Sequence, residues 1–510
     1  MRQWLSRIMA TLIVLGIILS PSLILPEVEG MPLVHATVTP NVTWDDFDAV
    51  GAYDTNCSLR EALYSAIYNF DYGGCTHTGD WDDDTDTIIL AHNTYSLSLS
   101  GYDDQGKVGD LDIYSVGAPA PSFTAPSPTA PSPDIIIQGA VDGSSINGND
   151  VDRVFEIMPG ISVLMDNVMI YNGLTKYPTD DSGSAIYVAG SLKITYSVIY
   201  GNRTMAGGSG GGIANMGGVL TLEHVIIQNN WTGNSTTDVV SGMGGGIYND
   251  GELFITDVYI TENNTGNNTS TGYIGGGGGI YNIGDASLVR VTIYDNYCGN
   301  ASARDGAGGG GILNNGELTI RTSTISGNRS GGGGLGGNYD GGPGGGIYST
   351  TAGVITIIDD STIAYNWTGR SSGTGYTYGG GIAVDSTDTT IKNTIVANND
   401  ADESPDCDSG FISTGFNLVE NDEGCSISGI DDTLHVDPML APLADLGVEG
   451  WIHALLPGSP AIDAGPAACG ATDQRHQQRA IDGDRDGTRM CDIGAYEARL
   501  LEFLPLIRIP

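Results

Sequence analysis

The stretch that decides the fold is GGGIYNDGELFITDVYITENN, residues 244–264. Three short runs, 247–249, 253–255 and 258–260, each place two residues on one side and an aromatic residue between them on the other. This is the alternation of a β-strand, in which successive side chains point to opposite faces. Asp250-Gly251, between the first two runs, is a turn dipeptide. The stretch therefore predicts three short strands separated by corners.

The same unit recurs along the middle of the chain. Gly-Gly-Gly-Ile occurs six times at intervals of 34, 33, 32, 35 and 35 residues, with its isoleucine at Ile213, Ile247, Ile280, Ile312, Ile347 and Ile382. A second pattern, Ile-x-x-Asn, keeps the same period, with its asparagine at Asn202, Asn230, Asn263, Asn296, Asn328, Asn366 and Asn398. Two patterns with one shared period indicate a structural repeat.

Strands of three to five residues cannot form a stable sheet alone, but each can pair with its equivalent in the next unit, about 4.8 Å away. The isoleucines then form a continuous apolar column. The asparagines that follow them, Asn215, Asn249, Asn282 and Asn314, are expected to form a ladder of side-chain amides. Helices are disfavoured, because the units lack apolar residues at 3.6-residue spacing and are rich in glycine. We predict an all-β parallel β-helix, a solenoid.

Between each Ile-x-x-Asn and the next Gly-Gly-Gly lies a variable stretch rich in Gly, Ser, Thr and Asn, such as 231–242. We interpret these stretches as loops at one corner of each coil, either a binding surface or tolerated insertions. They are not phosphate-binding loops, because the Gly-x-x-x-x-Gly-Lys-Ser/Thr pattern is absent.

The chain changes character at both ends. Residues 57–69 predict the one convincing helix, with Ser58 as its N-cap, placed to cover the open edge of the first coil. Residues 117–133 are a Pro-rich insertion, after which Ile135–Gln138 resumes the coils. After Asn399 the repeat is expected to end, and the remainder predicts closely packed irregular structure.

Six of the seven cysteines flank short segments in pairs, which predicts the disulfides Cys57–Cys75, Cys407–Cys425 and Cys469–Cys491. Each would close a loop of about twenty residues, worth about 3 kcal/mol. Cys298 is left as a free thiol. A metal site is the alternative, but no Cys-x-x-Cys or histidine cluster supports it.

The net charge predicts which partners the protein can bind, and the N-terminal residues predict where the protein is located. The net charge is −41, from 61 acidic and 20 basic residues, which excludes nucleic acid and anionic membranes as partners. Arg2 and Arg7, the apolar run 8–19 and the small-residue site at 34–36 predict a signal peptide, with a retained anchor as the alternative. No later stretch is apolar enough to span a membrane. We expect an extracellular or cell-surface protein.

One group of residues predicts a metal site. Asp482, Asp484 and Asp486, before Gly487, match the opening of a calcium-binding loop, although Ile493 stands where the last ligand is expected. The alternative is that they are solvated turn carboxylates. Calcium is the one cofactor that the sequence suggests.

Several motifs resemble known domains. CSLREA at 57–62 resembles the motif that names the CSLREA N-terminal domain of exported bacterial proteins, and GDLDI (109–113) and DRVFEI (152–157) are similar to the β-helix regions that follow it. LLPGSPAIDAG and CDIGAYE, within 437–497, resemble the choice-of-anchor Q domain. The resemblance implies a right-handed, pectin-lyase-like β-helix on a secreted or surface protein, with no settled activity.

The expected organisation follows from these segments. It comprises a signal peptide (1–36), an N-terminal cap (37–116), the Pro-rich insertion (117–133), the β-helix (134–399), a choice-of-anchor Q-like domain (400–497) and an apolar tail (498–510).

Two functions fit this organisation. The first is a non-catalytic surface protein for adhesion or glycan binding, with a polysaccharide or cell-surface glycan as partner. The second is a polysaccharide lyase or glycoside hydrolase on the same scaffold. The adjacent pair Asp359-Asp360 should face opposite sides, and His224 is expected to be a structural histidine in a strand. We name no catalytic residue and favour the first function.

Overall fold

The structure is a computed structural model, and it describes residues 35–49, 54–81, 85–101, 105–115, 134–175, 182–235, 242–268, 275–335, 337–350, 355–385, 388–446 and 451–499. The predicted signal peptide up to residue 34, the Pro-rich insertion and the apolar tail from residue 500 lie outside these residues.

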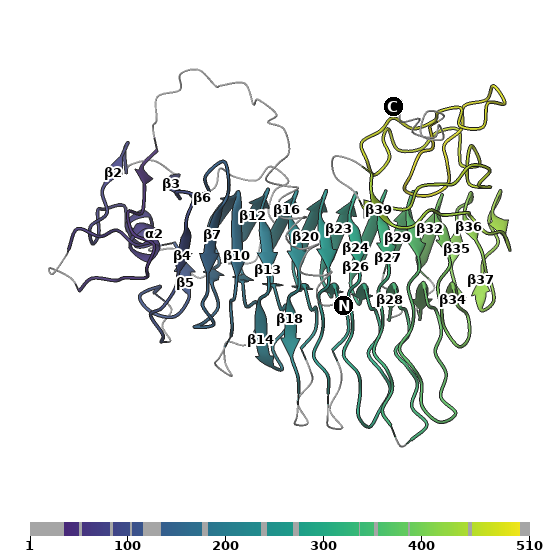
Figure 1. Cartoon of the computed structure of the whole chain (residues 1–510), viewed down its shortest axis with the longest axis horizontal. Coiled ribbons are helices and arrows are strands. Elements are labelled where there is room, and N and C mark those ends of the chain that lie inside the picture. The colour runs from purple at the N-terminus through teal and green to yellow at the C-terminus, as the bar shows by residue number, and fades with distance from the viewer. Residues whose placement is uncertain are drawn as a thin grey trace, which may run out of the picture.

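The molecule is a parallel β-helix whose coils follow one another along a single axis, from purple to green in Figure 1. Each coil contributes one strand to each of three sheets, numbered here in the order of the repeat. Within the described strands of these three sheets, neighbours are parallel, apart from the antiparallel pair β1–β2. The predicted fold class is confirmed.

Sheet 1 holds the Gly-Gly-Gly-Ile strands: β5 (Leu111–Ile113), β8 (Phe155–Ile157), β11 (Ile186–Val188), β15 (Ile213–Asn215), β19 (Ile247–Asn249), β22 (Ile280–Asn282), β25 (Ile312–Asn314), β28 (Ile347–Ser349), β31 (Ile382–Val384), β34 (Cys407–Gly410) and β37 (Cys425–Ser426). Sheet 2 holds the middle strands: β1 (Thr37–Val38), β2 (His77–Thr78), β3 (Asp86–Ile89), β6 (Ile135–Gln138), β9 (Ser162–Asp166), β12 (Ser191–Thr195), β16 (Val219–Glu223), β20 (Glu252–Thr256), β23 (Asp285–Val289), β26 (Glu317–Arg321), β29 (Thr356–Asp359), β32 (Thr389–Lys392) and β35 (Ile412–Ser413).

Sheet 3 holds the third strands: β4 (Thr94–Ser96), β7 (Ser144–Asn147), β10 (Val168–Tyr171), β13 (Val198–Tyr200), β17 (Ile226–Gln228), β21 (Tyr259–Thr261), β24 (Thr292–Tyr294), β27 (Thr324–Ser326), β30 (Thr362–Ala364), β33 (Ile395–Ala397), β36 (Leu418–Val419) and β38 (Thr433–Leu434). Two small pairs complete the strands: β14 (Arg203–Ala206) with β18 (Trp231–Gly233), and β39 (Ala444–Asp445) with β40 (Trp451–Ile452).

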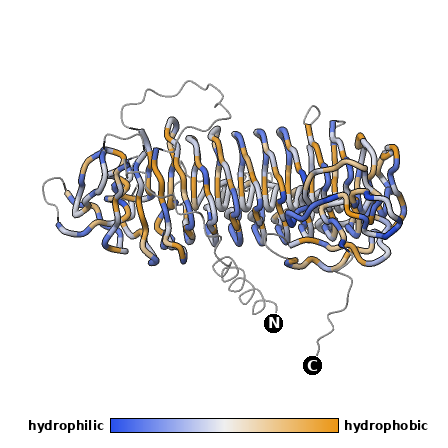
Figure 2. Tube along the Cα trace, turned by 90° about the horizontal axis from the view of Figure 1, so that it is seen from above, coloured by the Kyte–Doolittle hydropathy of each residue, from blue (hydrophilic) through white to orange (hydrophobic). Residues whose placement is uncertain are grey.

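The core is the predicted apolar column. Each sheet 1 isoleucine pairs directly with the isoleucine of the next coil, from Ile213 to Ile382, and all six are buried. One apolar cluster continues from Val38 to Ile427 through the whole solenoid. Figure 2 shows hydrophobic and hydrophilic residues alternating along the coils, because alternate residues face the core.

Buried asparagines join the coils in two ladders. In the predicted one, Asn215, Asn249 and Asn282 each donate from Nδ2 to Oδ1 of the next asparagine at 2.7–2.8 Å. The Ile-x-x-Asn residues form a second ladder that we did not predict, through Asn202, Asn230, Asn263, Asn296, Asn328, Asn366 and Asn399. In its last unit the ladder position is Asn399, one residue later than the pattern residue Asn398. The amides therefore satisfy backbone groups that the corners would leave unpaired.

A hydroxyl line runs beside the second ladder. Two residues after Asn202, Asn230, Asn263 and Asn328, a hydroxyl side chain donates to a nearby glycine carbonyl, as Thr232 does to Gly242 and Thr265 to Gly275, both at 3.0 Å. Cys298 occupies this position in its own coil, with Sγ 3.4 Å from the oxygen of Gly308. The predicted free thiol is buried and the three predicted disulfides are present.

The N-terminal cap is built around α2 (Leu59–Tyr68), which has Ser58 as N-cap in a capping box with Glu61, as predicted for the cap residue. Arg60 is fully buried and forms a bidentate pair with Asp45 at 2.7 and 3.0 Å. Its Nη1 also donates to the Asp110 carbonyl at 2.8 Å. The arginine of the CSLREA sequence therefore fastens the cap to the GDLDI segment, a structural role.

The solenoid continues beyond residue 399, where we expected it to end. Strands β34–β38 extend the three sheets as far as Leu434. They lack both repeat patterns, which is why sequence periodicity did not detect them.

The chain then folds back, and residues 437–446 and 451–499 lie against the side of the solenoid (yellow in Figure 1). Gln474 bonds the side chains of Thr292 and Thr324 on sheet 3, at 2.8 and 2.6 Å. In the part of the chain that the structure describes, no helix has the length and hydropathy needed to cross a membrane.

Candidate functional site

A line of outward-facing residues runs along the solenoid at the corner after sheet 3. They lie immediately after the first six asparagines of the second ladder and are Arg203, Trp231, Asn264, Tyr297, Arg329 and Trp367. We call this line the aromatic row. Parallel backbone pairing joins each member to the next, so the row stays in register over six coils.

Aromatic and polar residues alternate in the row. Trp231, Tyr297 and Trp367 occupy every second coil, and Asn264 and Arg329 occupy the coils between them. Since neighbouring strands lie about 4.8 Å apart, successive aromatic residues are about 9.6 Å apart along the axis.

Solvent reaches the row. Trp231 is 37% exposed, and Tyr297 and Trp367 are half-buried although their neighbours on both sides in the chain are buried. The Arg203 guanidinium lies 5.4 Å from the centre of a Trp231 ring, within cation–π range. The Tyr297 hydroxyl donates to Asp295. The row thus presents large apolar side chains beside fixed polar groups.

Carboxylates flank the row on the side of sheet 3. Asp295 and Glu262 lie at the corner two residues before Tyr297 and Asn264, and Gln228 donates to Glu262 at 3.2 Å. Burial raises the pKa of both carboxyl groups above their usual values. Their charges offset those of Arg203 and Arg329, so this surface has no excess of positive charge.

Exposed amides line the other side. Asn234, Asn267 and Asn300 each follow the row by three residues and are exposed. The Oδ1 atom of each accepts a backbone N–H of the next coil at 2.8 Å. This fixes the amides in place and leaves their NH2 groups as hydrogen-bond donors for a ligand.

The predicted calcium residues are only partly together. One oxygen each of Asp482, Asp484 and Asp463 lies within 4.8 Å of the others, and Asp486 is not in this group. Asp463 accepts the backbone N–H groups of Gly483 and Asp484 at 2.7 Å, and burial raises its pKa. Sequence reasoning missed Asp463 because it is 19 residues before Asp482. These three carboxylates could hold a calcium ion.

Asp359, Asp360 and His224, which the sequence analysis considered for catalysis, each contact other residues of the fold. Asp359 pairs with Arg321 at 3.5 Å, whereas Asp360 accepts from Asn393 at 2.7 Å and pairs with Arg479 at 3.4 Å. His224 lies at a corner with φ of 54°, not in a strand as expected, and stacks on Tyr196 at 4.7 Å. Each of these side chains therefore has a structural contact.

A second acidic group lies at the cap. Oxygens of Asp110, Asp112 and Glu156 lie within 4.8 Å of one another, with Arg153 2.8 Å from Glu156 and 3.5 Å from Asp110. Burial raises the pKa of Asp110 to about 7. The buried arginine among these carboxylates marks an ion-pair network that joins the GDLDI and DRVFEI segments.

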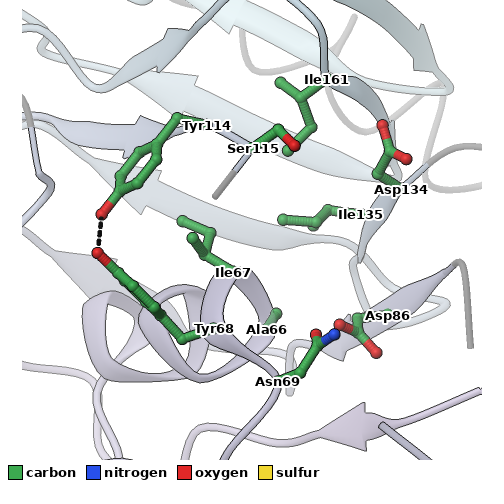
Figure 3. A pocket seen from close by; sticks show the side chains of 10 residues that line it. All are labelled: Ala66, Ile67, Tyr68, Asn69, Asp86, Tyr114, Ser115, Asp134, Ile135 and Ile161. Carbon is green, nitrogen blue, oxygen red and sulfur yellow. Dashed lines mark hydrogen bonds between the residues drawn. The ribbon is translucent and has the colours of Figure 1, made fainter. Parts of the chain in front are cut away.

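A cavity of about 290 Å³ lies between the end of α2 and the first coils (Figure 3). The hydroxyls of Tyr68 and Tyr114 bond each other across it at 2.7 Å, and Ile67 and Ile135 lie between them and Asp86. Asp134 accepts the Ser162 N–H at 2.6 Å. The cavity lies where the cap meets the first coils of the solenoid.

Comparison with known proteins shows only distant structural similarity. No family model matches the chain, and none of the curated proteins matches it. A pectate lyase structure is similar over 81% of this chain and 88% of its own, at 12% identity and a TM-score of 0.36. The A-module of a mannuronan C-5 epimerase from Azotobacter vinelandii is similar over 74% and 92%, at 13% identity and a TM-score of 0.23. We draw no function from either, and the CSLREA and choice-of-anchor resemblance stays a prediction.

Proposed function

We propose that this protein is an exported, non-catalytic polysaccharide-binding protein that binds its glycan along the aromatic row. The observation that carries the proposal is the row itself, in which Trp231, Tyr297 and Trp367 are held in register on the surface by backbone pairing. The predicted signal peptide supports export.

The chemistry of the row suits a sugar chain. A pyranose ring has an apolar C–H face, which packs on an aromatic ring, and a rim of hydroxyls, which needs donors and acceptors. The row supplies the rings, Glu262 and Asp295 supply acceptors, and Asn234, Asn267 and Asn300 supply donors.

The row is also rigid. Its backbone lies between the second asparagine ladder and the hydroxyl line, so little conformational entropy is lost when a ligand binds. A linear surface of this kind fits a linear polymer better than a compact ligand.

The test is binding of the purified mature protein to a panel of plant and bacterial polysaccharides. Trp231→Ala with Trp367→Ala should weaken binding by about 5- to 150-fold, since each of the two aromatic contacts contributes about 0.5–1.5 kcal/mol. Phe254→Ala is the matched control, because Phe254 is 44% exposed on sheet 2, outside the row. It should bind as the unmodified protein does.

Two results would refute the proposal. One is equal loss of binding in the control and in the row variant. The other is release of new reducing ends or unsaturated products with or without calcium, which would make the protein a hydrolase or a lyase.

A further inference from the structure

We infer that the glycan bound by the aromatic row is an uncharged, extended β-1,4-linked chain that lies parallel to the solenoid axis. This inference rests on the proposed function and adds the linkage, charge and direction of the ligand.

The alternation in the row determines the linkage. In an extended β-1,4-linked chain each sugar is turned over relative to the one before it, so the same face returns at every second sugar. The row has the same periodicity, because an aromatic side chain returns at every second coil, about 9.6 Å apart. A sugar disaccharide in such a chain has nearly this length. One sugar of each pair then packs on Trp231, Tyr297 or Trp367.

The polar members of the row match the alternate sugars. Asn264 lies between Trp231 and Tyr297, and Arg329 lies between Tyr297 and Trp367. Both offer N–H donors at the coils where the sugar presents its other face and its hydroxyls. A row with an aromatic residue in every coil would not distinguish the two faces.

The shape of the solenoid determines the direction in which the glycan chain lies. Its coils stack along one straight axis (Figure 1), and the row follows that axis through consecutive parallel pairs. A glycan that coils, as α-1,4- and β-1,3-linked chains do, would leave the row after one or two sugars. An extended chain can contact all three aromatic residues along the five coils from Trp231 to Trp367.

The charges near the row determine that the chain is uncharged. Arg203 and Arg329 are matched by Asp295 and Glu262, and the protein as a whole carries a net charge of −41. A polyuronate would be repelled by this field, because no excess positive charge at the site neutralises it.

The inference is tested by calorimetric titration of the full mature chain with β-1,4-linked gluco-, manno- and xylo-oligosaccharides of increasing length. Affinity should rise in steps as the chain becomes long enough to reach a second and then a third aromatic residue. Malto-oligosaccharides, laminari-oligosaccharides and oligouronates of equal length should bind at least about tenfold more weakly. Trp367→Ala should remove the last step in affinity without changing the binding of the shortest oligosaccharide, because Trp231 and Tyr297 remain.

A variant that changes the periodicity alone makes the test sharper. Trp231→Ala combined with Asn264→Trp keeps the number of aromatic residues and moves one of them by a single coil. It should lose about 2- to 13-fold in affinity for the long β-1,4-linked chain, the effect of one misplaced aromatic contact, and an unchanged thermal unfolding midpoint shows that it is folded.

The outcomes separate the two proposals. Equal affinity for coiled or uronate chains, or no loss in the moved variant, overturns the present inference and leaves the proposed function intact. Failure to bind any glycan overturns the proposed function itself.

Discussion

Replacing Asn263 by alanine removes one member of the second asparagine ladder. Its Oδ1 accepts the backbone N–H and the Nδ2 of Asn230, both at 3.0 Å, and its Nδ2 donates to the Ile227 carbonyl at 2.9 Å and to Asn296 at 3.0 Å. After the change, Asn230 Nδ2 still has the Ile199 carbonyl and Asn296 Oδ1 still has the Asn263 N–H. The Asn230 N–H loses its side-chain partner.

The expected cost follows from these contacts. A buried donor left without a partner costs about 1–3 kcal/mol, and each further lost bond about 1 kcal/mol. Since three further bonds are lost besides that of the Asn230 N–H, we expect Asn263→Ala to lower the free energy of unfolding by about 4–6 kcal/mol. Asn264→Ala is the matched control, because Asn264 is the next residue and is exposed, and it should change the free energy by no more than about 0.5 kcal/mol.

Denaturant unfolding followed by circular dichroism measures the free energy of unfolding of the two variants. Hydrogen exchange shows which coils lose stability. Coils of a solenoid interact mainly with their neighbours. Protection should therefore fall in β17, β21 and β24 and persist in β8 and β11. If Asn263→Ala is no less stable than Asn264→Ala, or protection falls evenly along the chain, the ladder does not stabilise the coils as we argue.

Three further predictions concern single sites. Burial lowers the pKa of His453 from 6.5 to about 4 where its ring contacts Ser326 at 2.9 Å and Ala441 at 2.8 Å. Its contribution is therefore present above pH 6.5 and is lost as the pH falls toward 4, by about 3 kcal/mol at most. Trp451 fluorescence should report this loss in the unmodified protein and not in His453→Gln; equal pH dependence in both would contradict it. Cys298→Thr should keep or raise the thermal midpoint, because Thr232 and Thr265 already bond loop carbonyls at this position, whereas Thr265→Val should lower stability by about 1–3 kcal/mol. Calcium binding remains a prediction: calcium should raise the thermal midpoint, and EDTA or Asp484→Asn should abolish the rise; no calcium-dependent shift would leave Asp463, Asp482 and Asp484 as turn carboxylates.

Periodicity made much of the fold predictable. Ile247 and Ile280 face the core because the spacing of Gly-Gly-Gly-Ile places them one above the other, and the asparagines two residues later follow from the same register. The disulfides followed from the closeness of the paired cysteines in the chain. Strands such as β36 could not be predicted, because they belong to coils that lack both patterns and are recognised only by the strands they pair with.

The candidate site was in the sequence but was not recognised. The residue after each ladder asparagine could have been compared across units, and the alternation of Trp231, Asn264 and Tyr297 would then have appeared. Contacts between distant segments of the chain could not be predicted from the sequence. No sequence pattern joins Gln474 to Thr292, or Asp463 to Asp484, because these contacts depend on how the irregular C-terminal segment folds back.

The second ladder has a consequence for how the protein can be produced. Some of its asparagines are followed two residues later by a threonine, so Asn230-Trp-Thr, Asn263-Asn-Thr and Asn366-Trp-Thr each match the acceptor sequence for N-linked glycosylation. In the folded coils these amides are fully buried and out of reach of any transferase. A eukaryotic secretory host modifies the chain before it folds, and a bulky carbohydrate on a ladder amide could not be enclosed. A bacterial host without that machinery avoids the conflict between modification and coil closure.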